Sequence, residues 1–265
     1  MRAGATGLGC LLALACGSAH ADEVRIAGFV TRESGTYILD EPAYDAFLRD
    51  TLGALAPTLG LTGATTGPGG LDVALGLGWQ PVKRTSTAWQ DALADQAPSA
   101  LTSVTLSARK GLPENLELGA HVAHVGDVAM TSASLELGWA IIGGENLLPD
   151  VGVRLDIGGV FGNPDATLLH AGANAVIGKR FALAGLVRIA PYAGYGFRLG
   201  QTIPRRVTLL DGVDPTPFET TLPAQTVQLH QGVIGVRIGF APLDLVIEGH
   251  FGTASGLRLS LVAAL

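Results

Sequence analysis

Three successive runs between residues 115 and 161 alternate strictly between large apolar residues and small or charged ones. They read LELGAHVA at 116–123, ASLELGWAI at 133–141 and VGVRLDIG at 151–158. Successive side chains of a β-strand point to opposite faces, so each run predicts a strand with one aliphatic face and one small or polar face.

The polar face of these predicted strands is rich in glycine and alanine. A face in water would favour Lys, Glu and Thr, and it has little reason to use glycine, which weakens a strand. A crowded interior does have that reason. We therefore predict an all-β protein, an antiparallel transmembrane β-barrel with aliphatic side chains toward lipid and a mixed polar lumen.

Composition supports a membrane protein. Hydrophobic residues make up 48% of the 265 residues and charged residues only 15%, which is too apolar for an ordinary water-soluble surface. The sequence contains no uninterrupted apolar run of about 18 residues, the length that predicts a spanning helix. A barrel is the membrane fold that remains. The net charge of −6 argues against a nucleic-acid partner.

The N-terminus predicts export. Arg2 supplies a basic region, residues 8–16 an apolar core, and Ala-His-Ala at 19–21 a cleavage sequence. We expect residues 1–21 to be a Sec-type signal peptide that is cleaved near Ala21.

Both cysteines of the chain, Cys10 and Cys16, lie inside this expected signal peptide. The mature protein would therefore have no thiol, disulfide or cysteine-based metal site. A lipoprotein, in which Cys16 is acylated, is the alternative interpretation of the same segment.

Residues 22–69 form an N-terminal segment with a predicted helix at about 41–53. Asp40 can cap this helix, Pro42 suits its first turn, and Pro57 ends it. Its apolar stripe consists of Tyr44, Phe47, Leu48, Leu52 and Leu55. We expect the helix to pack at the barrel mouth on the periplasmic side or to lie on the inner face of the membrane, and a plug inside the lumen is the alternative.

Residues 70–265 are predicted to form a barrel of about ten strands. The predicted strands are 71–80, 101–109, 115–125, 131–142, 150–161, 166–178, 186–201, 226–240, 243–252 and 257–265. Most have the length that crosses a bilayer at a tilt. Eight or twelve strands would also fit the pattern.

The connections sort by length. If the first strand rises from the periplasm, the long connections 81–100 and 202–225 are both external, and the short turns 110–114 and 241–242 are periplasmic. The first long connection predicts a short helix around Trp89, and the second predicts a hairpin.

Several short sequences occur in the order found in a known group of proteins. They lie within 54–60 (LAPTLG), 109–113 (RKGLP), 139–142 (WAII), 178–181 (GKRF) and 191–194 (PYAG). On these residues the chain resembles a group of outer-membrane β-barrel proteins of the deltaproteobacterial type, mostly of uncharacterised role. The resemblance covers most of residues 47–200, implies the same barrel fold, and carries no catalytic motif. The chain departs from the usual barrel pattern in ending on Leu265 rather than on an aromatic residue.

The predicted inward face gathers charged and polar residues of both signs. These lumen-lining candidates are Asp72, Arg109, Glu117, His121, Arg154, Asp156, His170, Asn174, Arg188, Tyr192, Arg198, Arg237, Asp244, Glu248, His250 and Arg258. The interior of a ten-strand barrel is narrow, so opposite charges can meet across it. The favoured interpretation is an ion-paired core, and a polar pore with weak ion selectivity is the alternative.

The histidines do not predict a catalytic or metal site. His121, His170 and His250 could be grouped with Glu248, but no spacing typical of a metal site or of an acid/base pair supports that grouping. We therefore expect no enzyme activity, no metal and no cofactor.

These observations predict an outer-membrane β-barrel of a Gram-negative bacterium that acts as a passive small-solute pore or as a structural membrane protein. The expected partners are outer-membrane lipid, the barrel-assembly machinery and small polar solutes. Two alternatives stay open: a soluble periplasmic β-barrel that binds an apolar ligand with its aliphatic face inward, and an outer-membrane enzyme with its site at the rim.

Overall fold

The computed structural model describes residues 24–33, 36–57, 63–82, 87–93, 97–143, 148–183, 187–209, 218–240 and 242–265. The expected signal peptide and the alternative lipoprotein cysteine lie outside these residues. Within the described ranges, no helix is both long enough and apolar enough to cross a membrane.

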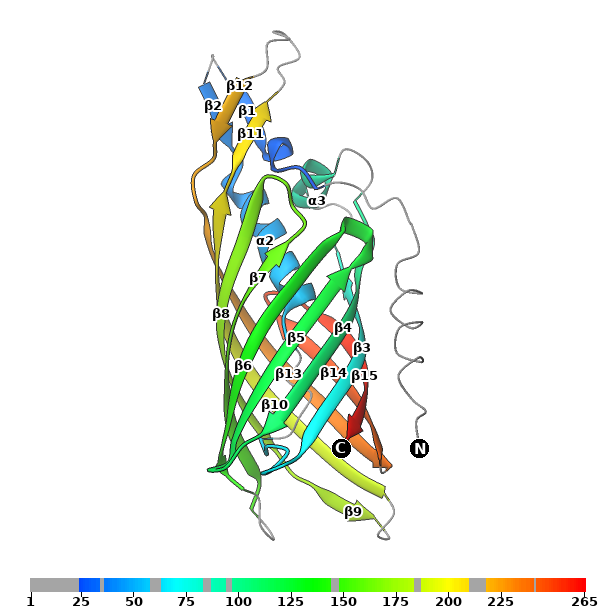
Figure 1. The fold of residues 1–265 in the computed structure, drawn as a ribbon. Helices are drawn as coiled ribbons and strands as arrows, with labels where there is room; N and C mark the ends of the chain where they lie inside the picture. Colours follow the sequence, from blue (N-terminus) through cyan, green and yellow to red (C-terminus); the bar gives the residue numbers. More distant parts are fainter. Residues whose placement is uncertain are drawn as a thin grey trace, which may run out of the picture.

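Ten antiparallel strands close into a barrel (Figure 1). In the order in which they pair around it they are β3 (Leu71–Pro81), β4 (Ala100–Gly111), β5 (Leu116–Val125), β6 (Met130–Ile142), β7 (Asp150–Phe161), β8 (Ala166–Gly178), β10 (Val187–Pro204), β13 (Thr226–Phe240), β14 (Leu243–Gly252) and β15 (Gly256–Ala264). β15 pairs with β3 to complete the ring, so the prediction of ten strands is confirmed.

Apart from α2, which enters the interior, the remaining elements lie at the two ends of the barrel. They are η1 (Ile26–Phe29), β1 (Val30–Glu33), β2 (Thr36–Leu39), α2 (Glu41–Leu55), α3 (Thr87–Ala92), η2 (Gly126–Val128), β9 (Phe181–Leu183), β11 (Arg206–Leu209) and β12 (Phe218–Thr221). The end with α3 and the β11–β12 hairpin is called the loop end here, and the opposite end, where β9 lies, is called the turn end (Figure 1). The short helix around Trp89 and the hairpin in the second long connection are both present, as predicted.

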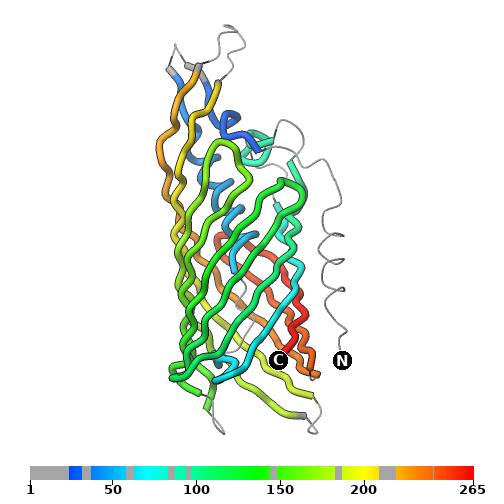
Figure 2. Tube along the Cα trace, in the orientation of Figure 1, coloured from blue at the N-terminus to red at the C-terminus, as the bar shows by residue number. Residues whose placement is uncertain are grey.

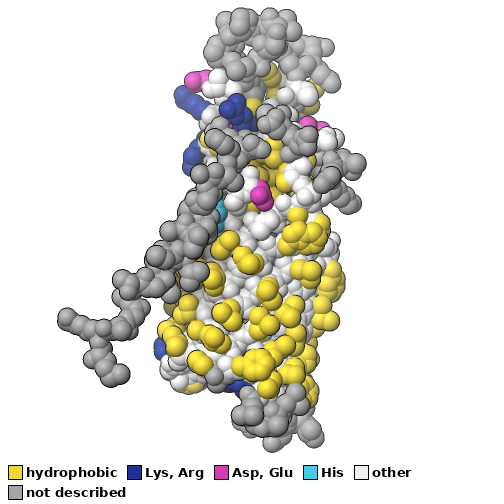
Figure 3. Space-filling model, turned by 90° about the vertical axis from the view of Figure 1, so that its right-hand side faces the viewer, with side chains coloured by type: hydrophobic (Ala, Val, Ile, Leu, Met, Phe, Trp, Pro, Cys, Tyr) yellow, Lys and Arg dark blue, Asp and Glu magenta, His cyan; other side chains and the backbone are white. Residues whose placement is uncertain are grey.

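The strands direct their aliphatic side chains outward and their charged side chains inward, as predicted. Leu135, Leu155 and Leu261 are 61%, 53% and 49% exposed on the outer surface, whereas Glu136 and Arg154 are 5% and 7% exposed. Figure 3 shows hydrophobic side chains spread over the barrel wall. A soluble barrel that holds an apolar ligand would need the reverse facing, so the structure does not fit that alternative.

Several exposed aromatic side chains lie near strand ends, whereas the exposed Tyr195 lies midway along β10. Trp79, Phe161 and Phe251 lie toward the loop end of their strands, and Trp139 and Phe240 toward the turn end. Aromatic residues at both margins of an apolar band are typical of membrane barrels. The alternation pattern alone did not separate these positions from the aliphatic ones.

The N-terminal segment lies inside the barrel. α2 runs from the loop end into the interior, as the blue trace in Figure 2 shows, and the chain then reaches the turn end, where β3 begins. The expectation that the helix packs at the periplasmic mouth or on the membrane surface is wrong, and the alternative of a plug is the one observed. The helix itself begins as predicted, because the carboxylate of Asp40 accepts a hydrogen bond from the backbone N–H of Ala43 at 3.1 Å.

Candidate functional site: the filled lumen and its polar pocket

The apolar stripe of α2 forms a hydrophobic core inside the loop end. Phe47 and Leu52 are buried there, and the rings of Phe47 and Trp89 meet edge to face with 4.9 Å between their centroids. The indole N–H of Trp89 donates a hydrogen bond to a carboxylate oxygen of Asp50 at 2.9 Å. The strand residues that complete this core are small or aliphatic, including Val125 and Leu229. Apolar side chains therefore fill the loop end of the lumen.

Burial also affects the tyrosine of this stripe. It raises the pKa of Tyr44 to about 12, because the phenolate would lose its hydration, although a hydrogen bond to Thr202 acts in the opposite direction. Tyr44 is therefore neutral at physiological pH.

Polar side chains of the barrel wall hold the C-terminal end of α2. The guanidinium of Arg258 donates hydrogen bonds to the backbone carbonyls of Ala56 at 2.6 Å, Gly53 at 2.9 Å and Ala54 at 3.2 Å. The hydroxyl of Ser132 donates to the carbonyl of Leu55 at 3.0 Å. The last carbonyls of a helix have no partner within the helix and carry its negative dipole end, so a buried arginine is well placed there.

The close packing around Gly53 also indicates that the C-terminal end of α2 lies against the barrel wall. A Cβ atom added at Gly53 would lie 2.5 Å from the Cβ of Ala254 and 2.8 Å from an amide oxygen of Gln80. The side-chain amide of Gln80 also donates a hydrogen bond to the carbonyl of Asp50 at 2.9 Å. Glycine thus lets the helix lie directly against the wall.

Beyond the helix, the lumen is filled by ion pairs. Nε of Arg109 lies 3.0 Å from a carboxylate oxygen of Glu136, and Arg154 lies 3.1 Å from Glu117 and 3.8 Å from Glu136. All four side chains are buried. Glu117 also accepts a hydrogen bond from the backbone N–H of Thr66 at 3.0 Å, so this network holds the N-terminal segment as well as the strands.

A second network centres on Asp156. The guanidinium of Arg198 donates two hydrogen bonds to this carboxylate, at 2.8 and 3.2 Å. The ring of His170 lies 3.4 Å from it, and the amide of Asn174 donates to it at 3.3 Å. Asp156 therefore contacts polar side chains from β8 and β10 at once.

Glu248 joins two further predicted residues. It accepts a hydrogen bond from the Tyr192 hydroxyl at 2.8 Å, and Nε2 of His250 lies 3.1 Å from its other oxygen. The rim-sited enzyme alternative needed His250 and Glu248 at the external rim. Both side chains are instead buried in the barrel interior, so the structure does not place a catalytic pair at the rim.

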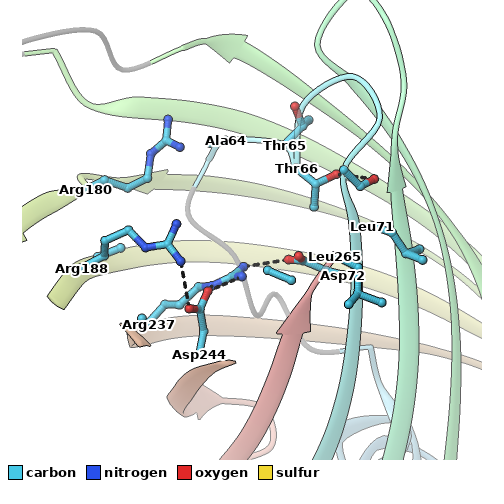
Figure 4. Close-up of a pocket in the computed structure, with 14 residues that line it drawn as sticks. Ala64, Thr65, Thr66, Leu71, Asp72, Arg180, Arg188, Arg237, Asp244 and Leu265 are labelled. Atoms are coloured by element: carbon cyan, nitrogen blue, oxygen red, sulfur yellow. Dashed lines mark hydrogen bonds and ion pairs between the residues drawn. The ribbon is translucent and has the colours of Figure 1, made fainter. Parts of the chain in front are cut away.

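A polar pocket of about 200 Å³ lies at the turn end (Figure 4). Arg237 lies 2.9 Å from Asp72 and also pairs with Asp244, which lies 3.3 Å from Arg188. Arg180 contributes to the wall from the connection between β8 and β9, while its guanidinium lies 3.3 Å from the buried carboxylate of Asp150.

The residues expected to line the lumen all lie on the inward side of the alternation. Asp72, Arg109, Glu117, His121, Arg154, Asp156, His170, Tyr192, Arg198, Asp244, Glu248 and Arg258 are buried, Asn174, Arg237 and His250 are partly buried, and Arg188 is exposed at the turn end. Among the described residues, neither ring nitrogen of His121 or of His250 has a hydrogen-bond partner, although Nε2 of His250 lies 3.1 Å from Glu248. That these residues line a solute pathway stays a prediction.

Several contributors were missing from the sequence-based set. Glu136 follows the inward alternation of β6 and could have been included on that signal. Thr66 and Arg180 lie outside the ten barrel strands, and no alternation marks them. Within the described part of the chain, no group of three or more His, Cys, Asp or Glu residues has a metal-binding arrangement.

Neither protein-family models nor curated protein sequences match this chain. Among solved structures, it is similar to Ail, the attachment invasion locus protein of Yersinia pestis, with 9% identity, a TM-score of 0.29, and coverage of 74% of this chain and 97% of Ail. The N-terminal β-barrel domain of Pseudomonas aeruginosa OprF matches with 12% identity, a TM-score of 0.31, and coverage of 75% and 99%.

LpxR from Salmonella typhimurium is also similar, with 15% identity, a TM-score of 0.33, and coverage of 62% of this chain and 72% of LpxR. Likenesses at these TM-scores carry no argument about function, and the fold rests on the strand pairing itself. Membership of the deltaproteobacterial-type group stays a prediction.

Proposed function

We propose that this protein is a sealed outer-membrane β-barrel, a structural membrane protein whose lumen is closed by its own N-terminal segment. The belt of half-exposed aliphatic side chains with aromatic residues at both margins supports a lipid-embedded wall. Export through the expected signal peptide, assembly by the barrel-assembly machinery and contact with outer-membrane lipid belong to the same proposal.

The observation that carries the proposal is the docking of α2 by Arg258. Three carbonyls at the C-terminal end of the helix are bound by one buried guanidinium, and Phe47 and its neighbours fill the lumen on the loop side. On the turn side, an ion that crossed would have to separate the pairs Arg154–Glu117 and Arg198–Asp156 in a narrow interior. Two consecutive barriers of different chemistry favour a closed lumen.

A small-solute pore is the competing function, and the polar turn-side lumen is the observation that favours it. In that case the N-terminal segment would leave the lumen or shift within it. Mixed charge in the lumen would then give weak ion selectivity. An enzyme is not proposed, because the side chains of His250 and Glu248 are 7% and 1% exposed and present no open site to a substrate.

Planar-bilayer recording on the purified protein separates these two functions. Insertion is first verified by heat-modifiable migration of the reconstituted protein. The sealed barrel predicts no steady current steps from the inserted protein. Stable steps of uniform size in the wild type would overturn the proposal in favour of the pore.

A variant that lacks residues 41–57 tests the role of the helix in the same recording. If α2 is the loop-side barrier, its removal exposes the turn-side ion pairs to water and is expected to produce fluctuating current. The variant must show heat-modifiable migration like the wild type, so that a current reports an inserted barrel.

A further inference from the structure

The pocket at the turn end has walls from two separate parts of the chain. Ala64, Thr65 and Thr66 of the N-terminal segment form one side, and Arg180 and Arg188 of the barrel form the other (Figure 4). Its volume of about 200 Å³ is larger than the volume of several water molecules, each of which takes up about 30 Å³ in the liquid. The pocket therefore has room for a small polar ligand between the plug and the barrel.

Its lining side chains carry one net positive charge, because three arginines face two aspartates. The carboxylate of Leu265 also lines the pocket, where it accepts a hydrogen bond from the backbone N–H of Leu71 at 3.1 Å. Arg237 is tied to both aspartates, Asp72 and Asp244, and its side chain is only 15% exposed. Arg180 and Arg188 differ from it, since both side chains are 59% exposed. The accessible cations of the pocket are thus these two arginines.

The ion pairs of Arg180 and Arg188 leave donors for a ligand. A guanidinium has five N–H donors in a planar fork. The hydrogen bond described for Arg188 runs from one terminal nitrogen to Asp244, and Arg180 meets Asp150 through Nε and one terminal nitrogen. The fork geometry matches the oxygens of phosphate or carboxylate groups.

We propose that this pocket binds a small oxyanion of the phosphate class between Arg180 and Arg188. The Thr65 hydroxyl, on the opposite wall, supplies a further polar contact, and Asp72 and Asp244 are kept from repelling the anion by their pairs with Arg237. The same chemistry is offered by free phosphate and by the headgroup of an anionic phospholipid. A bound anion would bridge the N-terminal segment and the barrel wall.

The test is calorimetric titration of inorganic phosphate into the full-length protein in neutral detergent micelles. A second arm measures binding of the protein to vesicles that contain phosphatidic acid, with phosphatidylcholine vesicles as the reference. We expect saturable binding of free phosphate, or retention by phosphatidic-acid vesicles alone, which would identify a lipid headgroup as the source.

Arg188→Gln is the cleanest variant, because Asp244 keeps its pair with Arg237 and no buried carboxylate loses its last cation. Loss of one charge-assisted contact is expected to weaken the observed binding about tenfold. Arg188→Lys keeps the positive charge but loses the planar guanidinium fork, so its affinity for the anion should lie between that of the wild type and that of Arg188→Gln. Arg206→Gln is the matched control, since Arg206 is 82% exposed on the loop-end hairpin.

Heat-modifiable migration identical to the wild type shows that each variant is folded. Should Arg188→Gln fail this criterion, Arg180→Gln combined with Asp150→Asn removes a cation and its buried partner together. Absence of saturable binding in both arms overturns the proposal, as does equal binding by the wild type and Arg188→Gln. The proposal does not depend on a closed lumen, because a conducting wild type could still bind phosphate here.

Discussion

The two halves of the lumen are filled by opposite chemistry. On the loop side, Phe47, Leu52 and Trp89 pack with aliphatic wall residues as in the core of a soluble protein. On the turn side, buried arginines and carboxylates pair across strands. The comparison indicates that a barrel with an apolar outer surface can have an apolar or an ion-paired interior. The part of the N-terminal segment that lies in each half determines which of the two interiors is required.

The physical reason is that the backbone of the N-terminal segment needs different hydrogen-bond partners in the two halves of the lumen. α2 satisfies its own backbone hydrogen bonds, so the wall around it needs only shape and apolar surface until its last turn, where Arg258 is required. The chain beyond the helix includes 63–70, which is not helical, and its backbone needs partners such as Glu117. Charged wall residues supply them.

Phe47→Ala tests the loop-side half and has the largest expected effect. Phe47 is fully enclosed and touches Phe29, Tyr44 and Trp89, so truncation should lower the free energy of unfolding by about 4 kcal/mol. Urea unfolding in lipid vesicles, followed by heat-modifiable migration, measures the change. Phe161→Ala on the outer surface is the control. A loss for Phe47→Ala no larger than that of the control would mean that α2 is not packed in the lumen.

Asp156→Asn tests the turn-side half. Asp156 is the carboxylate that pairs with the buried Arg198, so the change should lower the free energy of unfolding by about 3 kcal/mol. The same urea measurement applies, with the exposed Glu114→Gln as control. An unchanged midpoint would show that water already solvates this network.

Leu155→Arg tests the outer wall that both halves share. Leu155 lies midway along β7 and is half exposed, so arginine there should impair membrane insertion by about 2 kcal/mol. Leu148→Arg, beyond the end of the strand, should cost less because the penalty falls toward the interface. Folding yields into vesicles measure both. Equal yields for Leu155→Arg and the wild type would contradict the assigned facing.

Ser132→Ala has the smallest expected effect and tests the boundary between the halves. Its hydroxyl donates to the carbonyl of Leu55, and loss of that bond should cost about 1 kcal/mol. Ser134→Ala, on the same face of β6, is the matched control, because the Ser134 hydroxyl has no hydrogen-bond partner among the described residues. If both variants unfold at the same urea concentration, the contact with Leu55 does not contribute to docking.

The wall could be predicted from the sequence because its signal is local. Alternation at 133–141 and 151–158 fixes which side of each strand faces out, whatever the partner strand is. The start of α2 could also be predicted, since Asp40 and Pro42 act within one turn. The position of the helix inside the lumen could not be predicted. Arg258 could be assigned to the inward face, but nothing near it in sequence shows that its partners are backbone carbonyls about 200 residues away.

The site was predictable only in part, for the same reason. The alternation along the strands identifies Arg188, Arg237 and Asp244 individually as inward-facing residues. The pocket that they form also depends on Thr65 and Arg180, which lie outside the ten barrel strands. The spacing of His250 and Glu248 did not predict a shared site. The structure shows that Glu248 contacts both His250 and Tyr192 inside the barrel.

Amide hydrogen exchange in α2 of the protein reconstituted in lipid bilayers tests the central claim most directly. A helix packed in the lumen and held by Arg258 predicts protection of the Phe47–Leu55 amides comparable to that of the barrel strands β5 and β6. Exchange of these amides at the rate of an unprotected helix, while the strands stay protected, would contradict a lumen sealed by the N-terminal segment.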